Sequence, residues 1–318
     1  MAQLPPICRF LVALSLAFCF CAPAAADLYA TGGGIGAPSG LWTVNPLNGA
    51  SLLVWNLPGI QLNNGGLAYD EATDTLYATG SEVSDPGTSR LFVIDRATGA
   101  IASFPAMSGF IDLTSGGLAI HPLTGVMYAT GGYNDGVTAH QSTGLFTIDK
   151  QTGQASLIGF AGGNCCAGDF GLMLNGLGFR ADGTLFANGW ALGGPSYPDP
   201  TVSHLFTVDL TSGAATNIGA NDVALGRPLK YSGLAFAADG TRLRMGRLDA
   251  ASGALYWVAP ATRAANPRAT AGLPCGGGPI HFGVDGGLVF VPEPSFAAML
   301  TAGVLALAGA RRRARSGS

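Results

Sequence analysis

A repeat with a period of 50 to 60 residues runs through the middle of this 318-residue chain and leaves few folds open to it. The stretch GGLAYDEATDTLYATG at 65–80 returns as GGLAIHPLTGVMYATG at 116–131, and more loosely as NGLGFRADGTLFANGW at 175–190. A fourth copy begins with SGLAFAADGTRLRMG at 232–246. Self-similarity at such a period indicates supersecondary units that stack on one another and bury their faces together.

A second block follows each copy and carries its own turn signal. LFVIDRATGAIASF at 91–104, LFTIDKQTGQASLIGF at 145–160 and LFTVDLTSGAATNIGA at 205–220 share a leading leucine and an Asp-x-x-x-Gly turn. The aspartate can cap the turn, and the glycine suits the positive-φ position of a bulged hairpin. Five leading leucines, spaced by 50, 54, 60 and 50 residues, predict five units; they are Leu41, Leu91, Leu145, Leu205 and Leu255.

Each unit has four short stretches that alternate or run apolar, as β-strands do. Four antiparallel strands repeated around an axis form the blades of a β-propeller. We therefore predict an all-β propeller over residues 27–290 with five blades, or six if LVFV at 288–291 adds a further strand. The repeat resembles those of quinoprotein-like and NHL-like propellers in strand pattern, and no cofactor motif accompanies it.

The two ends of the repeat are expected to share one blade. Residues 28–31 read as a second-type strand, and PIHFGVDGG at 279–287 resembles a first-type strand. We predict that the latter completes the first blade and closes the ring. In the fifth unit, residues 249–253 and 259–263 both fit the position of the turn that Asp-x-x-x-Gly forms in other units.

The N-terminus has the pattern of a secretory signal. Arg9 precedes the apolar run FLVALSLAFCFC, and APAAA leads into Asp27. A positive n-region, an apolar h-region and small residues before the cut are typical of a signal peptide. The sequence predicts an apolar signal helix within residues 1–26, removed between Ala26 and Asp27.

The C-terminus combines an apolar stretch with a basic cluster. Residues 296–310 carry no charge and would span about 22 Å as a helix. That length is below the roughly 30 Å hydrocarbon core, but flanking arginines can snorkel to the interface. Arg311, Arg312, Arg313 and Arg315 would remain cytoplasmic by the positive-inside rule. The segment therefore reads as a hydrophobic membrane helix that anchors an exported protein.

The last 28 residues also resemble a known sorting signal. VPEPS at 291–295, a short Gly/Ala/Leu-rich span and an arginine cluster stand in the order of the PEP-CTERM signal of Gram-negative bacteria. The resemblance implies recognition by exosortase, a membrane transpeptidase-like enzyme, with cleavage near the motif. As with a GPI signal, the mature product would keep no transmembrane helix. It also implies a cell-surface or exopolysaccharide-matrix destination. The residues that carry the resemblance are Pro292, Glu293, Pro294, Arg311, Arg312 and Arg313.

The charge balance disfavours one class of partner. Without Arg9 and the four tail arginines, 11 basic residues remain against 19 acidic ones, a net charge of about −8. The remaining chain contains no basic cluster. Nucleic acid is therefore disfavoured as a partner, because its binding depends on neutralising phosphates.

Three cysteines remain in the expected mature chain, namely Cys165, Cys166 and Cys275. In an oxidising compartment one of the adjacent pair could bridge to Cys275 and leave an odd thiol. A zinc site is disfavoured, because NCCAG lacks the two-residue spacing that lets two thiolates converge on one ion.

The up-and-down order of strands within a blade predicts which loops lie together on one face, and this face is the candidate binding rim. In an up-and-down blade, connections after the first and third strands lie on one face, and they are short here. Connections after the second and fourth strands lie on the other face and are long, as in SEVSDPGTSR, GGYNDGVTAHQST and WALGGPSYPDPTVS. Loops on a rigid scaffold commonly carry function. The polar and aromatic candidates there are Glu82, Asp85, Tyr133, Asn134, Asp135, His140, Asp169, Trp190, Tyr197, Asp199 and His204.

Two kinds of chemistry fit these residues, each beside a plainer structural alternative. Trp190 and Tyr197 could stack on sugar rings, or Trp190 could simply pack at a strand end. Asp135 and Asp169 could share a Ca²⁺ ion with backbone carbonyls, or remain solvated acids. By contrast, Asp95, Asp149 and Asp209 recur at the same place in their units because each can cap a turn, and we assign them no catalytic role.

The sequence favours a non-enzymatic role. It contains no G-x-S-x-G elbow, H-E-x-x-H motif, P-loop or C-x-x-C-H haem site. We therefore expect an exported propeller that binds a ligand or partner, or serves a structural role, in the cell envelope or matrix, without a resident cofactor. The alternative is an extracytoplasmic propeller enzyme, either a metal-dependent hydrolase or lactonase or a quinoprotein-like oxidoreductase.

Overall fold

The computed structural model describes most of the repeat region. The described residues are 27–32, 39–45, 51–62, 65–107, 111–114, 116–133, 143–162, 172–191, 203–220, 233–236, 243–249, 252–258, 265–270 and 287–291. They lie in one compact unit, Asp27–Val291, and their regular structure is entirely β-strand. Within these ranges there is no helix of the length and hydropathy needed to cross a bilayer. The predicted signal helix and tail helix lie outside them.

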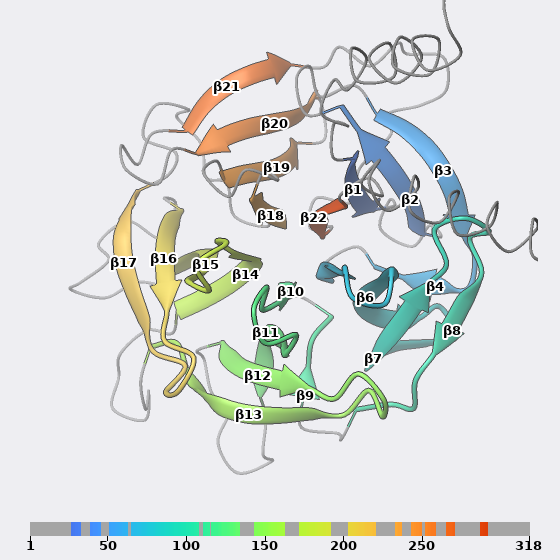
Figure 1. Cartoon of the computed structure of the whole chain (residues 1–318), viewed down its shortest axis with the longest axis horizontal. Helices are drawn as coiled ribbons and strands as arrows, with labels where there is room; N and C mark the ends of the chain where they lie inside the picture. The colour runs from blue at the N-terminus through green and yellow to red at the C-terminus, as the bar shows by residue number, and fades with distance from the viewer. Residues whose placement is uncertain are drawn as a thin grey trace, which may run out of the picture. The chain divides into compact units, whose positions relative to one another are not determined.

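The strands form five antiparallel sheets, each with a four-stranded main path (Figure 1). The first runs β22 (Leu288–Val291), β1 (Asp27–Gly32), β2 (Ser39–Val44), β3 (Ser51–Leu57). The second runs β5 (Leu67–Asp70), β6 (Thr75–Glu82), β7 (Asp85–Ile94), β8 (Ile101–Ser103). The third runs β10 (Leu118–Ile120), β11 (Met127–Tyr133), β12 (Gly144–Ile148), β13 (Ala155–Phe160).

The remaining two sheets repeat this order. The fourth runs β14 (Leu172–Phe179), β15 (Leu185–Ala191), β16 (His204–Val208), β17 (Ala215–Ala220). The fifth runs β18 (Gly233–Phe236), β19 (Leu243–Asp249), β20 (Ser252–Val258), β21 (Ala265–Thr270). Two short strands, β4 (Ile60–Gln61) and β9 (Ile111–Asp112), pair with the far ends of β6 and β11.

The five sheets close into a ring. Their first strands contact one another in the order β5, β10, β14, β18, β22, and β22 contacts β5 again. Figure 1 shows these strands around a common axis with the remaining strands outside them. The leading leucines all lie on third strands, as expected. The prediction of a five-bladed β-propeller is confirmed.

The closing strand differs from the one predicted. The strand that completes the first blade is β22, which pairs with β1, and not PIHFGVDGG at 279–287. LVFV therefore does not add a strand to a sixth blade. The signal was present in the sequence, since Gly286-Gly287-Leu288 repeats the Gly-Gly-Leu that opens the first strands at 65 and 116. In the fifth blade, the pair Asp249↔Ser252 makes 249–253 the hairpin between the second and third strands.

Glycine is required where neighbouring first strands meet. A Cβ on Gly66 would lie 2.1 Å from the Leu118 nitrogen, and one on Gly287 would lie 2.1 Å from the Leu67 nitrogen. A Cβ on Gly117 would lie 2.3 Å from the Asn175 oxygen. Side chains at these positions would push adjacent blades apart, because backbone atoms cannot move aside as a flexible side-chain end can.

A buried threonine holds each of these glycines from within its own sheet. The Gly66, Gly117 and Gly287 N–H groups donate to the threonine Oγ1 atoms at 2.8, 2.9 and 3.0 Å. The threonine N–H groups donate back to the glycine carbonyls at 3.0, 3.0 and 3.1 Å. The three threonines are at most 1% exposed, so loss of a hydroxyl would leave a buried donor without its partner. They are Thr79, Thr130 and Thr31 respectively.

The repeated aspartates act as turn caps. Asp95 Oδ1 accepts from the N–H groups of Ala97 and Thr98 at 2.8 and 3.0 Å, and Gly99 adopts a φ of 71°. The turns that begin at Asp149 and Asp209 repeat these bonds. Backbone N–H donors hold the pKa of Asp95 below its usual value. The scaffold role predicted for these residues is confirmed.

At three junctions, a second buried hydroxyl ties one blade to the next. Ser39 Oγ accepts from the Leu62 N–H at 2.7 Å, and Ser89 Oγ accepts from the Leu113 N–H at 2.7 Å. Thr143 Oγ1 accepts in the same way from the Leu174 N–H at 2.9 Å. Each hydroxyl lies at the third strand of one blade, and each donor precedes or enters the first strand of the following blade. These bonds fix the crossing between blades.

Gly117→Ala should lower the stability of the propeller by about 1–3 kcal/mol, because the new methyl group has no space between two first strands. Thermal and denaturant unfolding of the purified body would measure the loss. Gly132→Ala is the matched control, since its Cβ would meet nothing closer than 3.6 Å. Equal stability of both variants would show that the glycine does not mark close packing.

Candidate functional site

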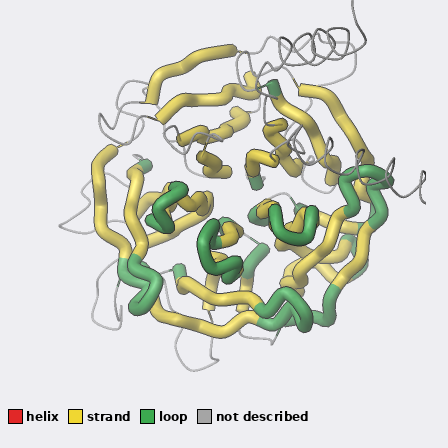
Figure 2. Tube along the Cα trace, in the orientation of Figure 1, coloured by secondary structure: helices red, strands yellow, loops and turns green. Residues whose placement is uncertain are grey.

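The short turns share one face of the ring. Arg96, in the β7–β8 turn, places its Nε 3.0 Å from Asp74 Oδ1 in the β5–β6 turn. Lys150, in the β12–β13 turn, pairs with Asp70 at the end of β5. We call this side the turn face; its described turns are 71–74, 95–100, 121–126, 149–154, 180–184 and 209–214 (Figure 2). The opposite side, where second strands end, is the loop face.

Tyr133 lies at the loop-face end of β11, opposite Ile111 of β9. Its ring is half-buried, 6.0 Å from Phe160 in an edge contact and 6.4 Å from Phe146. The side chain is therefore braced by the third blade rather than projecting freely. Trp190 lies in β15, in register with Met173 of β14.

His204 begins β16 on the same side of the ring. Its Nδ1 lies 3.3 Å from the Asn217 side-chain nitrogen, and its ring lies 6.1 Å from Phe206. These contacts are local to the fourth blade. Of the predicted rim, only Tyr133, Trp190, His204, Glu82 and Asp85 fall in the described part of the chain.

The other predicted functional residues lie outside the described residues. For the rim and the suggested Ca²⁺ site these are Asn134, Asp135, His140, Asp169, Tyr197 and Asp199. For the disulfide they are Cys165, Cys166 and Cys275, and for the sorting motif Pro292, Glu293, Pro294, Arg311, Arg312 and Arg313. Among the residues that are described, no three His, Cys, Asp or Glu side chains gather as a metal site would require.

The connection at 81–90 is not the long loop that we predicted. β6 continues to Glu82 and β7 begins at Asp85, and these two residues pair across a tight hairpin. Arg90 lies 3.4 Å from a Glu82 oxygen and 3.6 Å from an Asp85 oxygen. The charged residues that suggested a solvated loop instead pair along a two-stranded extension, whose register shifts between Gly80 and Glu82.

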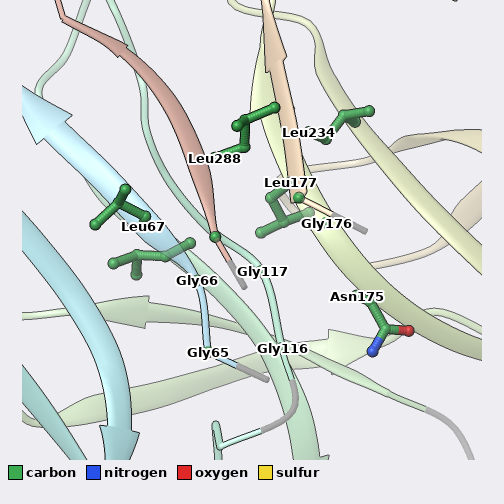
Figure 3. Close-up of a pocket in the computed structure, with 13 residues that line it drawn as sticks. Gly65, Gly66, Leu67, Gly116, Gly117, Asn175, Gly176, Leu177, Leu234 and Leu288 are labelled. Carbon is green, nitrogen blue, oxygen red and sulfur yellow. The ribbon is translucent and has the colours of Figure 1, made fainter. Parts of the chain in front are cut away.

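A cavity lies on the axis of the ring, away from the residues predicted to be functional. First strands of all five blades line it (Figure 3). A glycine–leucine level forms its narrow part, which has room for about one water molecule. A wider part of about 550 Å³, counting its open mouth, continues past the leucines toward the turn face. The five side chains at this wider level are Tyr69, Ile120, Phe179, Phe236 and Phe290.

Backbone edges supply most of the polar groups of this axial cavity. Gly66 and Thr79 form a hydrogen-bonded pair, so in the alternating antiparallel pattern the N–H and C=O groups of Leu67 and Tyr69 point away from β6. The equivalent bonds of Thr130 with Gly117 and of Thr31 with Gly287 give β10 and β22 the same parity. The cavity thus combines apolar side chains with strand-edge donors and acceptors, which water or a small ligand can satisfy.

Among the described residues that line the wide part, Tyr69 alone has an ionisable side chain, and its hydroxyl is hydrogen-bonded. It donates to Asp74 Oδ1 at 2.8 Å. Burial, together with the hydrogen bond and the charge of Asp74, raises the pKa of Tyr69 to about 12. Arg96 stacks over the ring at 5.9 Å and completes the cluster. The phenol therefore stays protonated and braces the turn.

His121 has a similar structural use. Its Nδ1 accepts from the N–H groups of Leu123 and Thr124 at 3.1 and 3.3 Å, as a capping carboxylate would. Its ring lies 4.9 Å from Phe179 of the next blade. The histidine therefore caps the β10–β11 turn.

Asp70 and Lys150 form an ion pair between the second and third blades. Their Oδ2 and Nζ atoms lie 2.5 Å apart, and the Asp70 side chain is only 5% exposed. Burial alone would raise the pKa of Asp70, but the hydrogen bond and charge of Lys150, with the Ala72 N–H, outweigh it and hold this pKa below the usual value. The carboxylate is thus charged at neutral pH.

No protein-family model matches the sequence, and no curated protein sequence does. Several solved structures are similar to this chain at low identity. TolB from Acinetobacter baumannii is 12% identical over 84% of this chain and 58% of its own, with a TM-score of 0.44. A putative 6-phosphogluconolactonase from Bacteroides fragilis is 13% identical over 77% and 81%, with a TM-score of 0.41. A nidogen–laminin complex chain is 14% identical over 74% of each, with a TM-score of 0.45.

These similarities concern the fold alone. The chain spans little more than half the length of the TolB chain from Acinetobacter that it matches. The described architecture by itself leads to one conclusion: the body of this protein is a β-propeller.

Lys150→Met should destabilise the propeller at neutral pH by about 1.5–3 kcal/mol, because it leaves the buried Asp70 carboxylate without its cation. Since the folded-state pKa of Asp70 is lowered, the contribution of the pair is complete above its unfolded pKa and is lost as pH falls through the folded value. The difference from the unmodified protein should therefore shrink below about pH 4.

Unfolding titrations from pH 7 to pH 3 would measure this difference. Arg180→Met is the control, because its partner Asp182 is 52% exposed and such pairs contribute about 0–1 kcal/mol. A Lys150→Met penalty that did not change with pH would contradict the ion-pair assignment.

Proposed function

We propose that this chain is the precursor of an exported β-propeller that acts as a non-enzymatic binding or structural protein at the cell surface or in the exopolysaccharide matrix. The segments at both ends serve as targeting signals. The first directs export, and the last holds the chain at the inner membrane until exosortase removes it near Pro292-Glu293-Pro294.

One structural observation carries the proposal. Asp27, the first residue after the expected signal cut, pairs directly with Val291, the residue before the Pro-Glu-Pro motif. In the second blade the equivalent pair is Asp70 with Thr75, the last pair before the β5–β6 turn. In the first blade the two strands have no such turn between them, because they come from opposite ends of the repeat. Removal of both end segments would thus leave every strand of the ring in place, which is what a disposable pair of sorting signals requires.

The charged groups of the described body support a structural or binding role. Asp70 with Lys150, Asp74 with Arg96, and Arg90 with Glu82 hold turns and blades together. These groups strengthen the disc on which loops would be displayed. The Asp70–Lys150 pair joins two blades, and the other two lie within the second blade. A linked pair of blades suits a protein whose use depends on staying closed outside the cell.

The loop face supports recognition of a partner by aromatic residues. Tyr133 and Trp190 lie in the second strands of adjacent blades, near the ends from which the long connections at 134–142 and 192–202 leave. Flat aromatic surfaces on neighbouring loops suit the C–H faces of sugar rings. We therefore favour an exopolysaccharide as the ligand of this face, with Trp190 and Tyr197 as its platform.

Intact-mass measurement of the protein recovered from a Gram-negative host that carries exosortase tests the sorting proposal. The expected product begins at Asp27 and ends near Pro292–Pro294. Glu293→Ala should leave the tail attached and the protein in the inner-membrane fraction, whereas Glu71→Ala, at an exposed turn, should be processed normally. Recovery of a surface protein with residues 296–310 intact would refute the processing step.

Binding to a polysaccharide array tests the loop-face proposal. Trp190→Ala or Tyr197→Ala should lower the affinity for the bound glycan by about 1–3 kcal/mol, a typical loss for an aromatic anchor. Leu123→Ala is the control, because this 72% exposed leucine lies on the turn face. If all three variants bind alike, the aromatic platform is wrong.

A further inference from the structure

We propose that the wide part of the axial cavity is a binding site for a small neutral aromatic compound, one or two fused rings in size, that enters from the turn face. This inference goes beyond the proposed function. It concerns the side of the disc opposite the loop face, and it does not depend on the sorting of the chain.

The wide part of the cavity is a pocket with an apolar floor. The floor is the glycine–leucine level, where the first strands approach so closely that only about one water molecule fits between them (Figure 3). A ring compound cannot pass this level, so the pocket opens on the turn face alone. The leucines of the floor are at most 6% exposed, and they are Leu67, Leu118, Leu177, Leu234 and Leu288.

The wall of the pocket is largely aromatic. Each blade contributes the residue two positions after its leucine, about 7 Å nearer to the turn face along an extended strand. Ile120 is the aliphatic member of this set, and the others are Tyr69, Phe179, Phe236 and Phe290. Aromatic side chains favour edge-to-face and offset contacts with a further ring. The wide part has room for about ten water molecules, which is enough for one or two fused rings.

The polar groups of the wall are the edges of the first strands. The parity of β5, β10 and β22 directs the N–H and C=O groups of Tyr69, Ile120 and Phe290 away from the second strands and toward the axis. The sheets hold these groups in place, so a ligand with a donor on its edge meets acceptors that are already oriented. A few fixed polar groups among apolar side chains are typical of a pocket for a small organic molecule.

The pocket offers no counter-charge to a charged ligand. No described residue that lines the wide part carries a charged side chain. Asp70, at the end of β5, is paired with Lys150, and Asp74, in the following turn, is paired with Arg96. An ion would lose its hydration here without gaining an ion pair, which favours a neutral ligand. A sugar is also disfavoured, because the described lining has no amide or carboxylate side chain to bind its hydroxyls.

The repeat supplies a substitution that fills the pocket. Ile120 holds the position that is aromatic in the other four blades, so the backbone there suits a larger ring. Ile120→Trp should occupy space at the wide level and compete with the ligand. Leu123→Ala is the matched control, because this 72% exposed side chain lies in the turn after Ile120 and does not line the pocket.

Calorimetric titration of the purified full-length chain with indole tests the proposal. We expect one saturable site with a dissociation constant below about 1 mM, a value within reach of about nine buried non-hydrogen atoms. N-methylindole lacks the N–H donor and should bind about five-fold more weakly. The anion indoleacetate should bind about ten-fold more weakly or worse. Ile120→Trp should weaken indole binding by about ten-fold or more, whereas Leu123→Ala should leave it unchanged.

Each part of the proposal has a result that would overturn it. Absence of saturable indole binding, or equal affinity of Ile120→Trp and the unmodified chain, would overturn the site. Equal affinity for indoleacetate and indole would overturn the neutral ligand, and equal affinity for N-methylindole and indole would overturn the role of the strand edges. Thermal unfolding establishes that each variant is folded. If Ile120→Trp is not folded, Ile120→Phe, which copies the other blades, replaces it with a smaller loss expected in the same direction.

Discussion

The close approach of five first strands around one axis is the constraint on which the rest of the structure depends. At Gly66, Gly117 and Gly287 the backbone of one blade lies where a side chain would otherwise be. A buried threonine on the second strand then satisfies the N–H group of each glycine. Blade spacing, the width of the axial cavity and the position of the closing strand all follow from these contacts.

Closure of the ring by its last strand is the feature that links the fold to the proposed function. Because the last first-type strand comes from the far end of the repeat, the ring is complete only when β22 joins β1. Both chain ends therefore leave from one corner of the turn face, at the pair Asp27↔Val291.

The sequence predicted the fold well because a propeller repeats its signals. The five leucines, the Asp-x-x-x-Gly turns and the four strands per unit could each be checked against their copies. Errors arose where a unit departs from the others. The closing strand was misplaced because Gly-Gly-Leu at 286–288 follows an atypical stretch, and Glu82 and Asp85 suggested a loop because their pairing with Arg90 is not visible in sequence. The axial cavity was missed because backbone atoms of distant residues form its walls.

Hydrogen–deuterium exchange of the mature protein tests the central claim most directly, since the claim is that β22 closes the ring by pairing with β1. The account predicts that amides of Leu288–Val291 and Asp27–Gly32 are protected as strongly as those of β5 and β6, and that both segments exchange together. Rapid exchange across 288–291, with β5 and β6 fully protected, would mean that the ring is not closed by this strand.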